Sequence, residues 1–309
     1  VLSRDEGFAP AHFALADIYL NKKELGKAIV ELERVGELDE ARSDEVLRKY
    51  FDLLKQDETN VEIRKAAVGL LLRKGMYQEA ISLCERALEI VPIGETAHFH
   101  LKLGEAQLER GSLSKAVVPL TKSLDLNPSL AEEASLLLKK ILAVDPSNIQ
   151  ARYSLARAYL SCEAFDKAVE EFSTIADTDP PKTKKVLEEL QRIYILDPTS
   201  ALAHYARGRR LFKSEAVSEF ERSLELGPQL LDRVILSLEQ LLKTHDEEAQ
   251  GRLILGRALI RKRLYDPAVL NLSRALALYP GLKEPVIGAL SKIREEDPRN
   301  TSSRLTLAE

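Results

Sequence analysis

The stretch Ala151–Pro180, ARYSLARAYLSCEAFDKAVEEFSTIADTDP, contains two short segments joined by a polar turn. Apolar residues recur at intervals of three and four in each segment, which is the spacing of one face of an α-helix. In the second segment, Ala168 is followed four residues later by Phe172. A small residue lets two antiparallel helices approach closely, and the larger one fills the space beside it. The stretch therefore predicts a packed pair of helices.

The same pattern occurs six times in the 309 residues. Two further clear copies read AHFALADIYLNKKELGKAIVELERV and GRLILGRALIRKRLYDPAVLNLSRALALYP. The anchoring alanines are Ala28, Ala80, Ala116, Ala168, Ala216 and Ala268. A pattern repeated along the whole chain predicts an array in which each unit packs on its neighbours.

These copies resemble the tetratricopeptide repeat (TPR), a helical pair of about 34 residues with the pattern W-x2-L-G-x2-Y, then A-x3-F, then P. In the copy around Ala168 the remaining slots hold Leu155, Ala156, Tyr159, Phe172 and Pro180. The chain has no tryptophan, and the Trp slot holds histidine or arginine in every copy. The resemblance implies an all-α fold, an α–α superhelix of the TPR solenoid type.

The spacing of the copies differs from that of the family. Successive anchoring alanines are 52, 36, 52, 48 and 52 residues apart, so most copies are followed by an insert of about 18 residues. The inserts carry a helical stripe of their own and end in phrases such as KKILAVDPSN (139–148), QRIYILDPTS and SKIREEDPRN. Proline stops a helix, and the serine, threonine or asparagine that follows can cap the next one. We therefore expect three-helix repeats of about 52 residues.

We expect residues 1–309 to form a single TPR-like solenoid, excised from a longer array because both ends begin or stop within a repeat. The helix pairs are predicted at 9–42, 61–94, 97–130, 149–182, 201–230 and 249–282. The extra helices are predicted at 43–56, 131–145, 183–197, 231–244 and 283–297. RRLFKSEA, which ends at Ala216, is four residues shorter than its counterparts, and this predicts a clipped helix pair.

Composition excludes several classes of function. The net charge of −4 disfavours nucleic acid as a ligand, and no apolar run is long enough to suggest insertion into a membrane. Two cysteines are too few for a disulfide scaffold, which favours a cytoplasmic protein. We find no phosphate-binding glycine loop, nucleophile elbow or HExxH motif, and His98 and His100 have no partners at metal-binding spacing. We expect no enzyme activity, no cofactor and no metal.

Likeness to the TPR family implies binding of a peptide or protein along the concave surface formed by the first helices. One slot of that surface holds Arg157, Arg209 and Arg257, the arginine ladder. Tyr153 and Tyr205 lie beside it, and Lys213 and Arg261 extend it. Arginines form bidentate bonds with carboxylates, so an acidic, partly apolar segment is the expected ligand of the C-terminal half.

Other interpretations stay open. The arginines would also suit exposed ion pairs with acids of neighbouring helices, and the tyrosines would suit packing between first helices. The carboxylate clamp of chaperone-binding TPRs is not reproduced, since Gly69 stands where the clamp requires asparagine. The alternatives to a binding scaffold are an array that self-associates end to end and a regulatory module of a larger enzyme or signalling protein.

Overall fold

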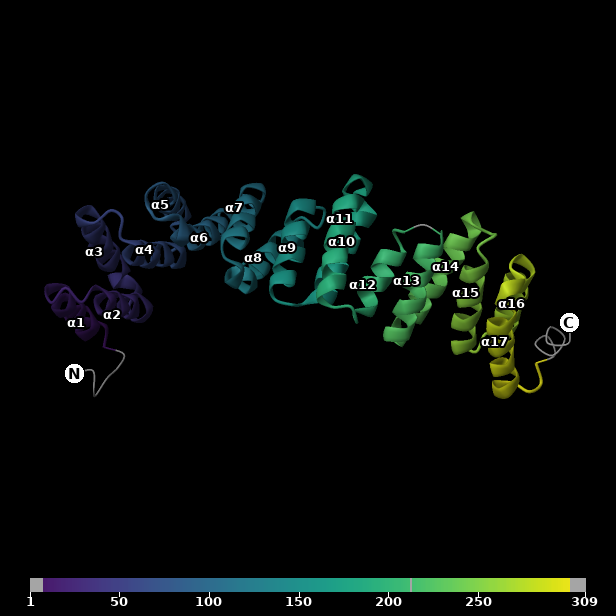
Figure 1. Cartoon of the computed structure of the whole chain (residues 1–309). Helices are drawn as coiled ribbons and strands as arrows, with labels where there is room; N and C mark the ends of the chain where they lie inside the picture. Colours follow the sequence, from purple (N-terminus) through teal and green to yellow (C-terminus); the bar gives the residue numbers. More distant parts are fainter. Residues whose placement is uncertain (1–7, 212, 301–309) are drawn as a thin grey trace. The chain divides into compact units, whose positions relative to one another are not determined.

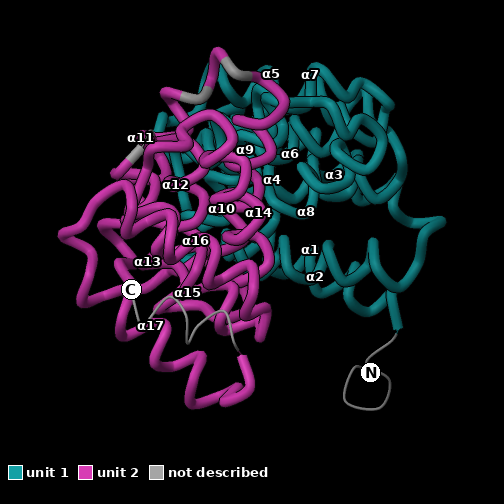
Figure 2. The backbone as a smooth tube through the Cα atoms, turned by 90° about the vertical axis from the view of Figure 1, so that its right-hand side faces the viewer, with its two compact units in different colours: residues 1–163 teal, residues 164–309 magenta. Residues whose placement is uncertain are grey.

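The computed structural model describes residues 8–211 and 213–300. Within these ranges the elements are α-helices and single 3-10 turns, without any strand, so the all-α prediction is confirmed. The chain forms two compact units, residues 1–163 and residues 164–309 (Figure 2). The expectation of a single array stays a prediction. The two ends, 1–7 and 301–309, from which we inferred an excised segment, lie outside the described residues.

Within each unit the helices follow one another in chain order (Figure 1). Those of the first unit are α1 (Ala9–Asn21), α2 (Leu25–Leu38), α3 (Ser43–Gln56), α4 (Val61–Arg73), α5 (Tyr77–Ile90), α6 (Thr96–Glu109), α7 (Leu113–Leu126), α8 (Ala131–Val144) and α9 (Ile149–Ser161). Those of the second unit are α10 (Phe165–Thr178), α11 (Thr183–Leu196), α12 (Ala201–Gly208), α13 (Lys213–Leu226), α14 (Leu231–Thr244), α15 (Ala249–Arg261), α16 (Tyr265–Leu278) and α17 (Lys283–Glu296). The 3-10 turns are η1 (Glu40–Arg42), η2 (Ile93–Glu95), η3 (Pro128–Leu130), η4 (Pro180–Lys182), η5 (Pro228–Leu230) and η6 (Pro280–Leu282).

The extra third helix of most repeats is present. The third helices are α3, α8, α11, α14 and α17, and each begins directly after a 3-10 turn. Between α5 and α6 the third helix is missing and only η2 joins the second helix of one copy to the first helix of the next. The prediction of three-helix repeats is therefore confirmed, with one two-helix repeat among them.

The Asp-Pro motif that follows the third helices ends one helix and caps the next, as predicted. After α8 the carboxylate of Asp145 accepts hydrogen bonds from the Ser147 hydroxyl at 2.7 Å and the Ser147 backbone N–H at 3.1 Å. The hydroxyl bond above all holds the pKa of Asp145 below its ordinary value. The side-chain oxygen of Asn148 then accepts from the N–H of Ala151 at 2.9 Å and caps α9. Asp197 repeats the turn after α11.

Within a pair, the first and second helices approach closely at the small residues of the repeat. A Cβ on Gly104 of α6 would lie 2.6 Å from Cγ of Leu120 and 3.2 Å from the carbonyl oxygen of Ala116, both on α7. A Cβ on Gly256 of α15 would lie 2.7 Å from Cγ of Leu272 on α16. At Gly104 and Gly256 the two helices of the pair therefore lie too close for a Cβ, whereas the copy around Ala168 holds Ala156 in this slot.

The helices of each unit also pack in rows, because consecutive antiparallel helices place every second helix on the same side. In the first unit α2 packs on α4, α4 on α6 and α6 on α8; in the second unit α13 packs on α15 and α15 on α17. These rows mix helix types. The row α2–α4–α6–α8 contains a second helix, two first helices and a third helix. Three helices per repeat is an odd number, so each type changes row from one such repeat to the next.

The clipped pair is seen at α12, which has 8 residues where α15 has 13. Arg210 lies two residues after its last residue, and the Arg210 side chain is only 6% exposed. Its guanidinium donates to the carboxylate of Asp177 and to the carbonyl of Ser173, each at 2.8 Å, and to the carbonyl of Ala206 at 3.1 Å. Burial lowers the pKa of Arg210. These bonds fasten the short helix to α10.

Candidate functional site

Two ladder arginines of the second unit are paired with acids of the chain itself. Arg209, the residue directly after α12, donates to both carboxylate oxygens of Asp177 on α10, at 3.0 and 3.2 Å. Arg257 of α15 donates to Glu221 on α13 at 3.0 Å. The arginine side chains are 34% and 42% exposed, respectively. Each therefore links two helices of a row while part of its side chain remains exposed to solvent.

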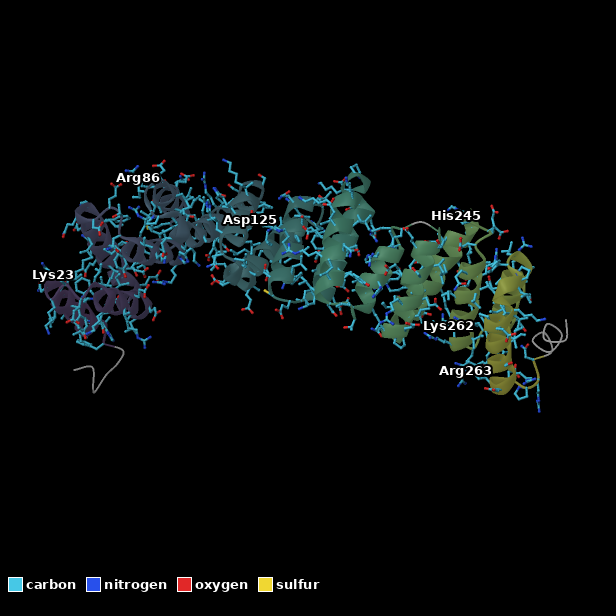
Figure 3. All side chains as sticks on the ribbon, in the orientation of Figure 1. Lys23, Arg86, Asp125, His245, Lys262 and Arg263 are labelled. Atoms are coloured by element: carbon cyan, nitrogen blue, oxygen red, sulfur yellow. The ribbon has the colours of Figure 1, made fainter. Side chains whose placement is uncertain are left out.

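The third ladder arginine lies in the first unit and makes the same kind of pair. Arg157 of α9 lies 2.6 Å from Asp125, which Figure 3 labels on α7. Tyr153, one turn earlier on α9, is half-buried. In all three cases the acid belongs to the second helix of the preceding pair, so the ladder residues share one local role in the packing of successive pairs.

Tyr205 of α12 is buried, with 6% of its surface exposed. Its hydroxyl lies 3.2 Å from the Ser237 hydroxyl on α14, and its ring packs at a tilt on Phe220 of α13. The guanidinium of Arg233 lies over the ring, 4.8 Å from its centre. These contacts place Tyr205 in the core between three helices. The side chain of Lys213 lies outside the described residues.

A groove with a cavity volume of about 390 Å³ opens between α13, α15 and α17, and it contains two of the predicted residues. We call it the C-terminal groove. Its lining is Glu221, Leu224, Glu225, Ile254, Arg257, Ala258, Ile260, Arg261, Pro285, Gly288, Ala289 and Lys292. A Cβ on Gly288 would meet no atom within 4 Å, so the α17 wall is open space above that glycine. The groove thus combines an apolar floor with charged edges.

The cations of the C-terminal groove are not equally neutralised. Arg257 is paired with Glu221, and Glu225 is paired with Arg222 at 2.8 Å. Arg261 donates to the carbonyl oxygen of Leu224 at 2.9 Å. In the described part of the chain, no carboxylate lies within ion-pair distance of the Arg261 guanidinium.

The neighbours of Arg261 differ from it. Lys262, labelled in Figure 3, pairs with Asp232 at 2.7 Å. Lys292, on the α17 edge of the groove, reaches Glu296 only at 3.9 Å. Arg261 and Lys292 are therefore the positive charges that the groove offers to a ligand.

The copies of the helix pair also match known family models. One tetratricopeptide repeat model matches residues 9–42, which contain α1 and α2, and a second matches residues 130–184, which contain α8, α9 and α10. The chain is a tetratricopeptide repeat protein. Its TPR pairs are interrupted by third helices, and its fold is the all-α superhelix of TPR solenoids. TPR arrays serve in general as scaffolds for protein–protein interaction.

Solved TPR structures resemble the chain at low identity. YrrB, described as a TPR protein with an unusual peptide-binding site, is 16% identical over 74% of this chain and 90% of its own, with a TM-score of 0.24. The C-terminal part of a TPR repeat-containing protein from Cytophaga hutchinsonii is 13% identical over 96% and 99%, with a TM-score of 0.28. The TPR2AB domain of yeast Sti1, in a complex with pHSP90, is 14% identical over 96% and 98%, with a TM-score of 0.30. With values this low, what those proteins bind says nothing of what this chain binds. No curated protein sequence matches the chain significantly.

The sequence missed the two outer walls of the C-terminal groove. The resemblance to plain TPR arrays predicts binding residues on the surface of the first helices. The groove is bounded instead by α13, a second helix, and α17, a third helix. Lys292 and Gly288 were not singled out for that reason. The signal that could have found them is the odd number of helices per repeat, which brings all three helix types into one row.

Metal-binding and membrane-spanning features are absent from the described residues. Within residues 8–211 and 213–300, no three His, Cys, Asp or Glu side chains come together closely enough to hold a metal ion. None of the helices described has the length and apolar character needed to cross a bilayer.

Proposed function

We propose that the chain is a protein-interaction scaffold whose second unit binds an acidic, partly apolar segment of a partner protein in the C-terminal groove. The observation that carries this proposal is Arg261, a guanidinium without an acidic partner at the edge of an apolar floor. A carboxylate that binds it gains charge-assisted hydrogen bonds, each worth about 1.5 to 3 kcal/mol. Apolar side chains of the same segment would cover Ile254 and Pro285.

The ladder arginines are weaker candidates for this contact, because each is already paired with an acid of the chain. An approaching carboxylate would have to share Arg257 with Glu221 and Arg209 with Asp177. An exposed pair of this kind is worth about 0 to 1 kcal/mol, so the exchange is nearly neutral. We therefore propose Arg261 as the main contact of the acidic segment, and Arg257 and Arg209 of the second unit as weaker ones. Arg157 and Tyr153, on α9 of the first unit, stay separate predicted binding residues.

The test uses a fluorescein-labelled peptide of alternating glutamate and leucine and its glutamine–leucine counterpart. Fluorescence anisotropy should show tighter binding of the acidic peptide, weakened by salt. Arg261→Gln should reduce its affinity about tenfold, as the loss of one charge-assisted bond implies. Arg274→Gln removes the same charge from α16, outside the groove, and should leave the affinity unchanged. Equal binding of both peptides, or equal loss in both variants, contradicts the proposal.

The two alternatives from the sequence stay predictions. End-to-end self-association depends on residues 1–7 and 301–309, which lie outside the described ranges, and light scattering across a range of concentrations tests it. A regulatory role in a larger enzyme or signalling protein stays a prediction from the sequence, and so does the cytoplasmic location.

A further inference from the structure

A second groove, on the first unit, has a different charge pattern. Its volume is about 380 Å³, and it lies where α2, α4 and α6 pack side by side. We call it the N-terminal groove. Its lining is Gly26, Ile29, Val30, Glu33, Glu62, Lys65, Ala66, Gly69, His98 and Lys102. The residues from each helix are three or four apart, so each helix contributes one stripe.

The lysines of this groove are already neutralised. Lys65 lies 3.2 Å from Glu62 and 2.9 Å from Glu95. Lys102 lies 2.9 Å from Glu105. Burial above all, together with these two lysines, lowers the pKa of His98 to about 4, so its imidazole is uncharged at neutral pH. The α4 and α6 walls therefore carry little net positive charge.

Glu33 of α2 is the charged residue of the groove that forms no ion pair in the described part of the chain. It is half-buried, and in the described part of the first unit no lysine, arginine or histidine nitrogen lies within ion-pair distance of its carboxylate. Burial raises the pKa of Glu33; Arg73 lowers it, and the negative charges of Glu37 and Glu62 raise it further. A half-buried carboxylate without a partner gains free energy when a cation binds it.

The second unit contains an equivalent carboxylate, Glu221, which has an arginine partner. Glu33 lies five residues after the anchoring alanine of its helix, and Glu221 occupies the same position in α13. Glu221 binds Arg257, which lies in the ladder slot of the following first helix. In α4 that slot holds Gly69. The N-terminal groove therefore has the acid of this pair without its arginine.

The space beside Glu33 is open. A Cβ on Gly69 or on Gly26 would meet no atom within 4 Å. Val30 of α2, which is 62% exposed, gives the groove an apolar surface, and the mostly buried Ala66 lines it on α4. The methylene groups of a long basic side chain can lie on such surface while its charged end reaches a carboxylate.

We propose that the N-terminal groove binds an arginine side chain of a partner protein, with its guanidinium on Glu33 and its methylene groups along Val30 and Ala66. A guanidinium is favoured because its planar fork matches both oxygens of a carboxylate. The partner would supply the group that Arg257 supplies to Glu221 within the chain. The proposal rests on residues of the first unit and stands independently of the C-terminal groove.

The experiment measures the binding of a fluorescein-labelled peptide with one arginine between two valines, and of the same peptide with citrulline in place of arginine. Citrulline keeps the shape of arginine and removes its charge. The full 309-residue chain should bind the citrulline peptide at least tenfold more weakly. Glu33→Gln should weaken binding of the arginine peptide at least tenfold. Gly69→Arg should do the same, because the new side chain would occupy Glu33 itself.

The matched control is Glu37→Gln, which removes the same charge one turn further along α2, where Glu37 pairs with Arg34 at 3.2 Å. It should leave the affinity within twofold of the original. Thermal unfolding followed by circular dichroism confirms that each variant is folded. The proposal is overturned if the unaltered chain binds neither peptide or binds both equally. It is also overturned if Glu33→Gln or Gly69→Arg binds the arginine peptide as the unaltered chain does.

Discussion

Replacement of Gly69 on α4 tests whether an arginine in this ladder slot can pair with Glu33, as Arg257 pairs with Glu221 in the second unit. Gly69→Ala should raise the free energy of unfolding by about 1 kcal/mol, because glycine is a poor helix former and the new Cβ meets no atom within 4 Å. Gly69→Arg should give a similar gain from helix propensity and about 1 kcal/mol more from the pair with Glu33. The expected difference between the two variants is therefore about 1 kcal/mol.

A double-mutant cycle with Glu33→Gln isolates that difference. In the Glu33→Gln background, Gly69→Arg should be no more stabilising than Gly69→Ala. Urea is the suitable denaturant because it adds no ions that would screen the pair. Hydrogen exchange of the α4 amides reports the local effect, since an array need not unfold in one step. A coupling energy near zero, with both variants folded, refutes the equivalence of Glu33 and Glu221.

Three further outcomes follow from the packing of single residues. Gly104→Ala should destabilise the chain by about 1 to 2 kcal/mol in urea, because overpacking against Leu120 outweighs the gain in helix propensity; a stabilised variant would contradict the close approach of α6 and α7. Gly288→Leu should keep the fold and weaken the acidic peptide about tenfold by filling the C-terminal groove, while Gly288→Ala leaves affinity unchanged; equal affinities would show that the peptide binds elsewhere. As pH falls from 6.5 towards 4, the unfolded chain binds a proton at His98 that the folded chain excludes, so the first unit should lose stability over that interval. His98→Gln should remove this part of the pH dependence in thermal unfolding, and an unchanged profile would place the cause in other groups.

The helices and their ends were predictable from the sequence because they depend on local chemistry. The apolar stripes predicted the third helices, and Asp145 with Asn148 predicted where α8 ends and how α9 is capped. The four-residue deficit before Ala216 predicted the short α12. Each of these features is decided within about one or two helical turns, so neighbouring residues are enough to specify it.

The candidate sites were only partly predictable. The ladder slot led to Arg257 and Arg261, which line the C-terminal groove. It did not lead to Lys292, and it could not show that Arg257 is paired with Glu221 while Arg261 has no acid beside it. The acid that neutralises a ladder arginine comes from a helix 30 or more residues away, and no local pattern states which one.

The sequence by itself determined that this chain is a TPR array with an additional helix in most repeats. The apolar stripe that each helix buries is visible as a periodic pattern in its own residues. Only the tertiary structure decided which stripes share a row. An odd number of helices per repeat moves each helix type from one row to the other, so the lining of a groove depends on packing between repeats. That packing brings Arg257 to Glu221, and it places Glu33 beside a groove whose ladder slot holds Gly69.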